Sequence, residues 1–154
     1  MSLVPLKQAV WDFGTGNGQV AKVLANHFDK VHATDISELQ LSHSVKKENF
    51  FYAVSALEKT LFSDNSFDLI TVAQAIHWFD FEAFYSEVKR TLKHGDLLAV
   101  IGYGLLKINV DADKIINHLN TWIIHDYRDK ERRYRNENYL TIPFPFKEIK
   151  KPAI

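Results

Sequence analysis

The segment from Asp12 to Gly18 constrains the possible folds of this chain more than any other part of it. An apolar run, Gln8 to Phe13, leads into glycines at positions 14, 16 and 18, and apolar residues at helical spacing follow. Glycine permits a sharp turn and lets backbone N–H groups approach a ligand closely at the start of a helix. The pattern therefore predicts a ligand-binding loop after the first strand of an α/β fold.

Four further apolar segments are separated by stretches with helical periodicity. They are Val31 to Asp35, Phe50 to Val54, Phe67 to Ala73 and Leu97 to Ile101. Strands that are apolar on both faces and alternate with helices are typical of a parallel sheet covered on both sides. Right-handed crossovers then predict a doubly wound, Rossmann-like sheet, mainly parallel, with strand order 3-2-1-4-5.

Capping residues mark where two of the helices begin. Ser37 and Gln40 form a capping-box pattern. Asp80 is the predicted N-cap of a helix that we expect to end at Lys93-His94-Gly95. That helix carries apolar residues along one side, so we expect it to cover the sheet.

Composition excludes several classes of protein. The chain has 154 residues, enough for one compact domain, and its 19 basic and 19 acidic residues cancel. This balance gives no phosphate-tracking surface, so we expect no nucleic-acid partner. Cysteine is absent and the histidines lack the spacing of metal ligands, so we expect no metal. No apolar run is long enough to span a bilayer and no signal pattern is recognised, so we expect a cytoplasmic protein without a membrane partner.

The sequence changes character after the fifth predicted strand. A helical apolar stripe, Ile115 to Tyr127, precedes a basic run, Arg128 to Arg135, and an extended segment, Ile142 to Phe146. We therefore predict a core over residues 1–104 and a helical and extended tail over 105–154 that forms part of a substrate lid. The basic run is either a solvated helix face or a patch that binds a substrate carboxylate.

The fifth predicted strand has no recognisable neighbour beyond it. An apolar strand at an open edge promotes association with other chains. We therefore expect either that the natural protein is longer or that a partner chain, such as the second copy in a homodimer, covers the strand from Leu97 to Ile101.

Two acidic residues frame the glycine loop. Asp12 lies two residues before Gly14, where a carboxylate would repel a pyrophosphate but suits a ligand with an ammonium group and a sulfonium. Asp35 ends the second strand at about the 20-residue spacing expected of an acid that binds ribose hydroxyls. Gln19 stands where a dinucleotide site has its third small residue.

Val10 to Gln19 and Ala33 to Ser37 resemble motif one and the ribose-binding motif of class I S-adenosylmethionine-dependent methyltransferases. Gln74 to Asp80 and Glu87 to Lys93 resemble a small-molecule branch related to trans-aconitate methyltransferase. The resemblance covers roughly residues 8–104 and implies an S-adenosylmethionine-binding core there. It departs from the family pattern at His94-Gly95-Asp96, where Pro-Gly-Gly is usual. We also expect the family's N-terminal helices and its terminal antiparallel strand pair to be absent from this sequence.

The resemblance implies a role for each residue of the cofactor site. The backbone of the glycine loop lies against the methionine part, and Asp12 helps order the amino group or the loop. Asp35 binds the ribose, Ile36 lies beneath the adenine, and Leu57 and Glu58 edge it. The implied cofactor-binding residues are Asp12, Gly14, Thr15, Gly16, Gly18, Asp35, Ile36, Leu57, Glu58 and Gln74.

The residues after the fourth strand lie at the sheet edge where doubly wound folds bind ligands. The resemblance places Gln74 beside the transferring methyl group. His77 is a candidate general base, because histidine titrates near neutral pH, and a hydrogen-bonded structural role is the alternative. A carboxylate acceptor needs no base, whereas a hydroxyl or an amine can need one.

The predicted activity is S-adenosylmethionine-dependent methylation of a small molecule, with a carboxylate as one candidate acceptor. S-adenosylhomocysteine is then the product. Two alternatives stay open, a catalytically inactive S-adenosylmethionine-binding module and an NAD-dependent oxidoreductase. Asp12 and Gln19 both disfavour the oxidoreductase.

Overall fold

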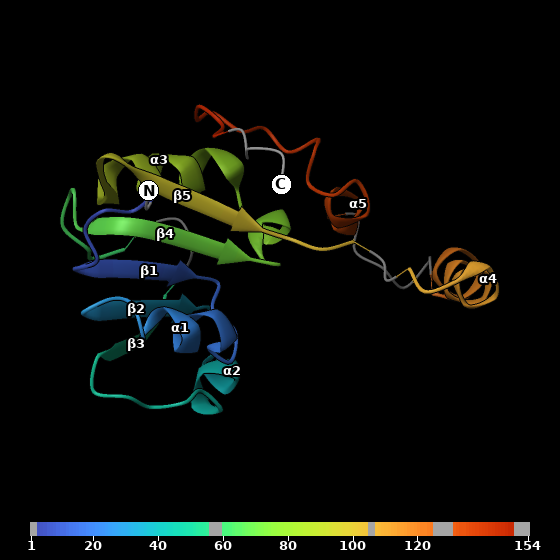
Figure 1. The fold of residues 1–154 in the computed structure, drawn as a ribbon, viewed down its shortest axis with the longest axis horizontal. Helices are drawn as coiled ribbons and strands as arrows, with labels where there is room; N and C mark the ends of the chain where they lie inside the picture. Colours follow the sequence, from blue (N-terminus) through green and yellow to red (C-terminus); the bar gives the residue numbers. More distant parts are fainter. Residues whose placement is uncertain (1–2, 56–59, 105–106, 125–130, 150–154) are drawn as a thin grey trace.

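The computed structural model describes residues 3–55, 60–104, 107–124 and 131–149. It contains a five-stranded sheet in the order β3-β2-β1-β4-β5, in which all neighbouring strands run parallel (Figure 1). The strands are β1 Ala9–Phe13, β2 Lys30–Asp35, β3 Phe50–Val54, β4 Phe67–Ala73 and β5 Leu92–Ile101. The predicted α/β fold and strand order are confirmed, and no strand in the described part of the sheet is antiparallel.

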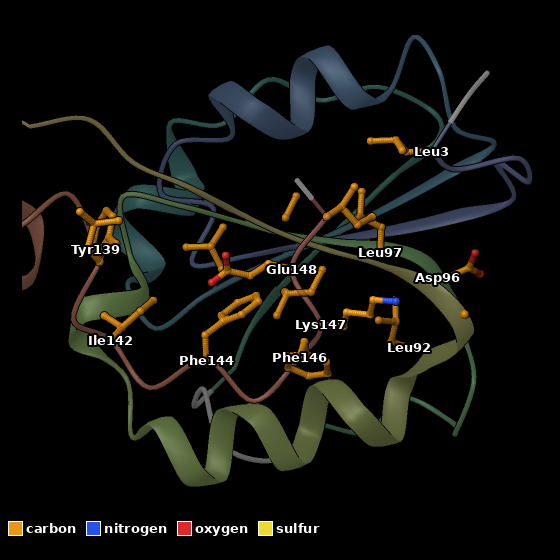
Figure 2. A pocket seen from close by; sticks show the side chains of 16 residues that line it. Leu3, Leu92, Asp96, Leu97, Tyr139, Ile142, Phe144, Phe146, Lys147 and Glu148 are labelled. Atoms are coloured by element: carbon orange, nitrogen blue, oxygen red, sulfur yellow. The ribbon is translucent and has the colours of Figure 1, made fainter. Parts of the chain in front are cut away.

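Short helices connect the strands and continue beyond β5. They are α1 Gln19–Leu24, α2 Glu38–Ser42, the 3-10 turn η1 Ile76–Trp78, α3 Phe81–Thr91, α4 Val110–His118, the π-helical turn η2 Leu119–Ile123 and α5 Arg132–Asn136. The capping predictions are confirmed at Ser37, which accepts a hydrogen bond from Gln40 N, and at Asp80, which accepts one from Ala83 N. Figure 2 shows α1 and α3 on opposite sides of the sheet, as a doubly wound fold requires.

The core consists of two apolar layers, one on each face of the sheet. Alternation along β1 sends Trp11 and Phe13 into the layer beneath α3, and Val10 into the layer beneath α1. Phe84 of α3 and Ala21 of α1 are fully buried in these layers. Both faces of the sheet are therefore covered, which explains why β1 and β4 are apolar at nearly every position.

The fifth strand begins earlier than the sequence predicts. The expected helix end at Lys93-His94-Gly95 is wrong, because α3 ends at Thr91 and β5 already starts at Leu92. The β4–β5 pairing is irregular between Phe67 and Leu69, and Gly95 takes a φ of 86° within β5. The residues predicted to end the helix thus form a bulge inside a strand, which Gly95 permits through its left-handed conformation.

The segment after β5 leaves the sheet and then returns to it (Figure 1). The apolar stripe that predicts a helix over 115–127 does form α4 and η2, although Tyr127 lies outside the described residues. This helical arm stands away from the sheet, and Trp122 on it is 77% exposed. Farther along, Phe144 and Phe146 pack back against the core layer beneath α3.

The outer edge of β5 borders an apolar groove of about 820 Å³. Figure 2 shows its other wall, the returning segment that carries Ile142, Phe144 and Phe146. Leu97 to Val100 of β5 are partly buried there. The expectation that a longer chain or a second copy covers this edge stays a prediction.

Among the residues that the structure describes, no helix is both long and apolar enough to cross a membrane.

Candidate functional site

The glycine loop joins β1 to α1 at the carboxyl edge of the sheet. Gly14 and Gly16 have φ values of 68° and 57°, in the left-handed region that favours glycine. A Cβ atom on Gly14 would lie 2.7 Å from the Cβ of Ala75, so close packing as well as conformation excludes a side chain there. At Gly16 a Cβ atom would meet nothing within 4 Å. The loop is therefore packed from behind at Gly14 and open on the side of Gly16.

The end of the neighbouring strand β2 holds this loop in place. The carbonyl oxygen of Thr34, at the end of β2, accepts hydrogen bonds from Gly14 N at 2.9 Å and Thr15 N at 3.0 Å. Gly18 caps α1 in a left-handed conformation, and its N–H donates to Thr15 O at 3.0 Å. The loop residues predicted from the sequence thus share one hydrogen-bonded turn.

Asp12 is buried beneath the loop. Its Oδ2 accepts a hydrogen bond from Thr15 Oγ1 at 2.5 Å, and its Oδ1 accepts one from Thr71 Oγ1 at 2.7 Å. Burial raises the pKa of this carboxyl, and the two hydroxyl bonds oppose that rise. Of the two roles expected for Asp12, ordering the loop is the one that these contacts describe.

Asp35 lies beside the open side of the loop. Its Oδ2 accepts a hydrogen bond from Gly16 N at 2.7 Å, and its Oδ1 accepts one from Ser37 N at 2.9 Å. Ile36 follows and is 67% exposed. A carboxylate and an apolar surface therefore sit next to each other at the mouth of the glycine loop.

Leu57 and Glu58, the residues predicted to edge an adenine, lie outside the described residues, as do positions 128–130 of the basic run. Their placement stays a prediction. The remaining predicted cofactor-binding residues of β1, β2 and their loops are brought together at one edge of the sheet.

The segment after β4 forms the neighbouring part of the same edge. Gln74 has a φ of 55°, and its backbone N–H donates to Ile101 O at 2.9 Å. Its side-chain Nε2 donates to Tyr103 O at 3.1 Å, so the amide is held by the segment that follows β5. His77 is only 5% exposed, whereas the adjacent Trp78 is 49% exposed.

His77 contacts a residue that the sequence did not single out. The Tyr139 hydroxyl lies 2.9 Å from His77 Nδ1, across 62 positions of sequence. Thr71 was missed as well; it lies opposite Asp12 on the adjacent strand β4, and strand order alone does not give this register. For Tyr139 no local pattern gives the signal, because it acts from the returning tail.

Metal binding finds no support in the described part of the chain, where no three His, Asp or Glu residues are grouped to hold an ion.

Comparison with known proteins identifies methyltransferases as relatives of this chain. The family described as "Methyltransferase domain" matches residues 11–100. A Dictyostelium discoideum protein provisionally named a methyltransferase is 37% identical over 146 residues, which are 93% of this chain and 56% of that protein.

Solved structures of methyltransferases are also similar to this chain. A structure from Anaeromyxobacter dehalogenans, provisionally assigned as a type II methyltransferase, is 33% identical with a TM-score of 0.84 over 97% of this chain and 64% of that one. A structure described as an S-adenosylmethionine-dependent methyltransferase from Aquifex aeolicus is 27% identical with a TM-score of 0.60, over 70% of this chain and 63% of that one. The chain spans less than two thirds of the length of each of these relatives.

Proposed function

Because this chain belongs to the methyltransferase domain family, we propose that it binds S-adenosylmethionine and transfers the methyl group to a small-molecule acceptor. One observation carries the proposal. The carboxylate of Asp35 and the open side of Gly16 face the same place at the carboxyl edge of the sheet, where folds of this class bind ligands.

The residues around Asp35 fit the adenosine part of the cofactor. An ionised carboxylate can accept about four hydrogen bonds, and one is used on each oxygen of Asp35, by Gly16 N and Ser37 N. Acceptor capacity therefore remains for two ribose hydroxyls. The exposed side chain of Ile36 provides an apolar surface for the adenine ring.

The glycine loop fits the methionine part. It places backbone groups within reach of a ligand because no Cβ atom stands between Gly16 and the open space beside it. Asp12 supports the loop from below through Thr15 and Thr71, and its carboxylate favours the positive end of the ligand.

The bound cofactor supplies a methyl carbon that its sulfonium has already activated. The task left to the chain is to align the acceptor with that carbon and to exclude water. Gln74, His77 and Trp78 follow β4 at the carboxyl edge of the sheet, beside the loop, and in this proposal the acceptor enters there. In this proposal His77 removes a proton from a hydroxyl or amine acceptor.

The tail forms part of the wall on the acceptor side. α5 packs beside η1, and Arg135 on it is partly buried. Arginine pairs well with carboxylates, so this placement supports a carboxylate-bearing acceptor and the substrate-lid role predicted for residues 105–154. A likeness to the trans-aconitate branch is part of the same proposal.

A second candidate is a module that binds the cofactor without turning it over. It is favoured by the burial of His77 and by its bond to Tyr139, since a structural histidine has these properties too. NAD-dependent oxidation is disfavoured by the carboxylate of Asp12 beneath the loop.

Two measurements test the proposal. We expect S-adenosylhomocysteine to raise the unfolding temperature of this chain and to bind in calorimetry, while NAD does neither; stabilisation by NAD alone would contradict it. Transfer of a labelled methyl group from S-adenosylmethionine to trans-aconitate or to a panel of small acids, alcohols and amines then separates an enzyme from a binding module.

A further inference from the structure

Tyr139 of the returning tail contacts His77 on the acceptor side of the site. Asn138 and Tyr139 have φ values of 53° and 59°, and Tyr139 N donates to Tyr134 O at 2.7 Å, which closes the end of α5. A left-handed conformation is costly for residues with a side chain, so it persists where surrounding contacts hold it. This turn directs the Tyr139 ring back toward the end of the sheet.

The Tyr139 ring packs directly against Gly102. A Cβ atom on Gly102 would overlap Cε2 and Cδ2 of Tyr139. Gly102 does not have a positive φ, so glycine is required there because a side chain would overlap the Tyr139 ring. Gly102 directly follows β5, which fixes the ring against the carboxyl edge of the sheet.

The hydroxyl of Tyr139 contacts His77. The Tyr139 Oη and His77 Nδ1 atoms are 2.9 Å apart, and the ring centroids are 5.8 Å apart. Trp78 contacts the same imidazole at a centroid distance of 4.7 Å. His77 belongs to the turn whose Ala75 and Phe79 pack against Gly14, so this contact joins the tail to the wall of the cofactor loop.

We propose that Tyr139 is a positioning residue that fixes the orientation of the His77 imidazole on the acceptor side of the site. The proposal rests on the proposed function for its meaning in catalysis. The tyrosine hydroxyl can donate to Nδ1 or accept from it, so the contact holds the orientation of the ring in either tautomer. A proton donated from Nδ1 to the tyrosine oxygen would leave the basic lone pair on Nε2, as a general base requires.

The test compares Tyr139→Phe with Tyr134→Phe. Tyr134 lies on the same tail, and its hydroxyl accepts a hydrogen bond from Arg133, so the control removes a tyrosine hydroxyl that does not contact His77. Ring nitrogen resonances are recorded by NMR on histidine labelled with nitrogen-15, and His77→Asn identifies the signal of His77. S-adenosylhomocysteine affinity and methyl transfer to the acceptor panel are measured on the same proteins.

We expect Tyr139→Phe to shift the His77 ring nitrogen signals, because Nδ1 loses its hydroxyl partner, while Tyr134→Phe leaves them in place. Cofactor affinity stays within about twofold, and kcat falls about 3- to 10-fold, which corresponds to the loss of one hydrogen bond. Gly102→Ala, which displaces the ring without removing the hydroxyl, should reproduce the change in the spectrum.

Unchanged His77 signals in both Tyr139→Phe and Gly102→Ala would overturn the proposal. A moved signal with an unchanged kcat would also overturn it, because the residue would then be structural only. If the wild-type chain binds no cofactor and methylates nothing, the proposed function is wrong. The NMR comparison then still decides whether Tyr139 fixes the orientation of the His77 imidazole.

Discussion

The Oδ2 atom of Asp35 accepts a hydrogen bond from the backbone N–H of Gly16 at 2.7 Å. This bond links the end of β2 to the loop that follows β1. The residue proposed to bind the ribose therefore also holds the shape of the loop proposed to bind the methionine part. A change at Asp35 should act on the cofactor twice, through a lost ligand contact and through a loosened loop.

Asp35→Ala should weaken binding of S-adenosylhomocysteine by about 10- to 150-fold, as expected for the loss of about 1.5–3 kcal/mol of charge-assisted hydrogen bonding. Isothermal titration calorimetry measures this directly. Asp35→Asn is the matched control, since its amide oxygen can still accept from Gly16 N. Unchanged affinity in the alanine variant would remove Asp35 from the site.

Alanine at Gly14 and alanine at Gly16 should have different effects. Both substitutions cost about 1–2 kcal/mol in backbone conformation. Gly14→Ala adds a clash with Ala75, worth about 1–3 kcal/mol, so its main effect should be a lower free energy of unfolding. Gly16→Ala meets no protein atom and should mainly weaken S-adenosylhomocysteine binding. Urea unfolding and calorimetry on both variants separate the effects, and equal losses of stability would contradict the assignment.

His77→Asn should remove a pH-dependent step of methyl transfer if the acceptor is a hydroxyl or an amine. A general base typically contributes about 10²–10⁴ in rate, so the loss in kcat should fall in that range near neutral pH. The rate of the wild-type protein is then measured against pH with each acceptor that it methylates. A flat wild-type profile would instead indicate a carboxylate acceptor, for which the chain needs no base.

The fold was predictable because it depends on patterns that are local in the sequence. β1 and β4 are apolar at almost every position since both faces of the sheet are covered, and Ser37 and Asp80 cap helices with their own neighbours. The start of β5 was not predictable in the same way. Lys93 lies in the bulged part of the strand, and its ammonium group reaches Asp68, a contact across 25 positions that no local pattern predicts.

In the candidate site too, residues set by local patterns were predictable and their partners distant in sequence were not. Asp12, Asp35 and the glycines are recognisable because their spacing along the chain reflects one strand–turn–helix unit and the next strand. The Asp12 partner Thr71 and the His77 partner Tyr139 lie 59 and 62 positions away in sequence. No periodicity connects such residues, so only the folded structure brings them together.

Asp68 offers a test of stability at the opposite edge of the sheet from the cofactor loop. It is fully buried at the start of β4. Its Oδ2 accepts hydrogen bonds from the backbone N–H groups of Gln8 and Ala9, and its Oδ1 accepts one from Lys93 Nζ at 2.6 Å. Burial acts to raise the pKa of this carboxyl, but the bonds from Lys93 and the two backbone groups outweigh it and lower the pKa.

A carboxyl whose pKa is lower in the folded than in the unfolded state stabilises the fold above the unfolded value, near pH 4, and loses that contribution as the pH falls through the folded value. Asp68→Asn should therefore reduce the free energy of unfolding at pH 7 by about 1.5–3 kcal/mol, because its amide group would face Lys93 without a charge. The difference from wild type should shrink progressively below about pH 4. Urea unfolding of both proteins between pH 3 and pH 7 measures it, with the exposed Asp29→Asn as control, and a difference that grows toward low pH would contradict the assigned role of Asp68.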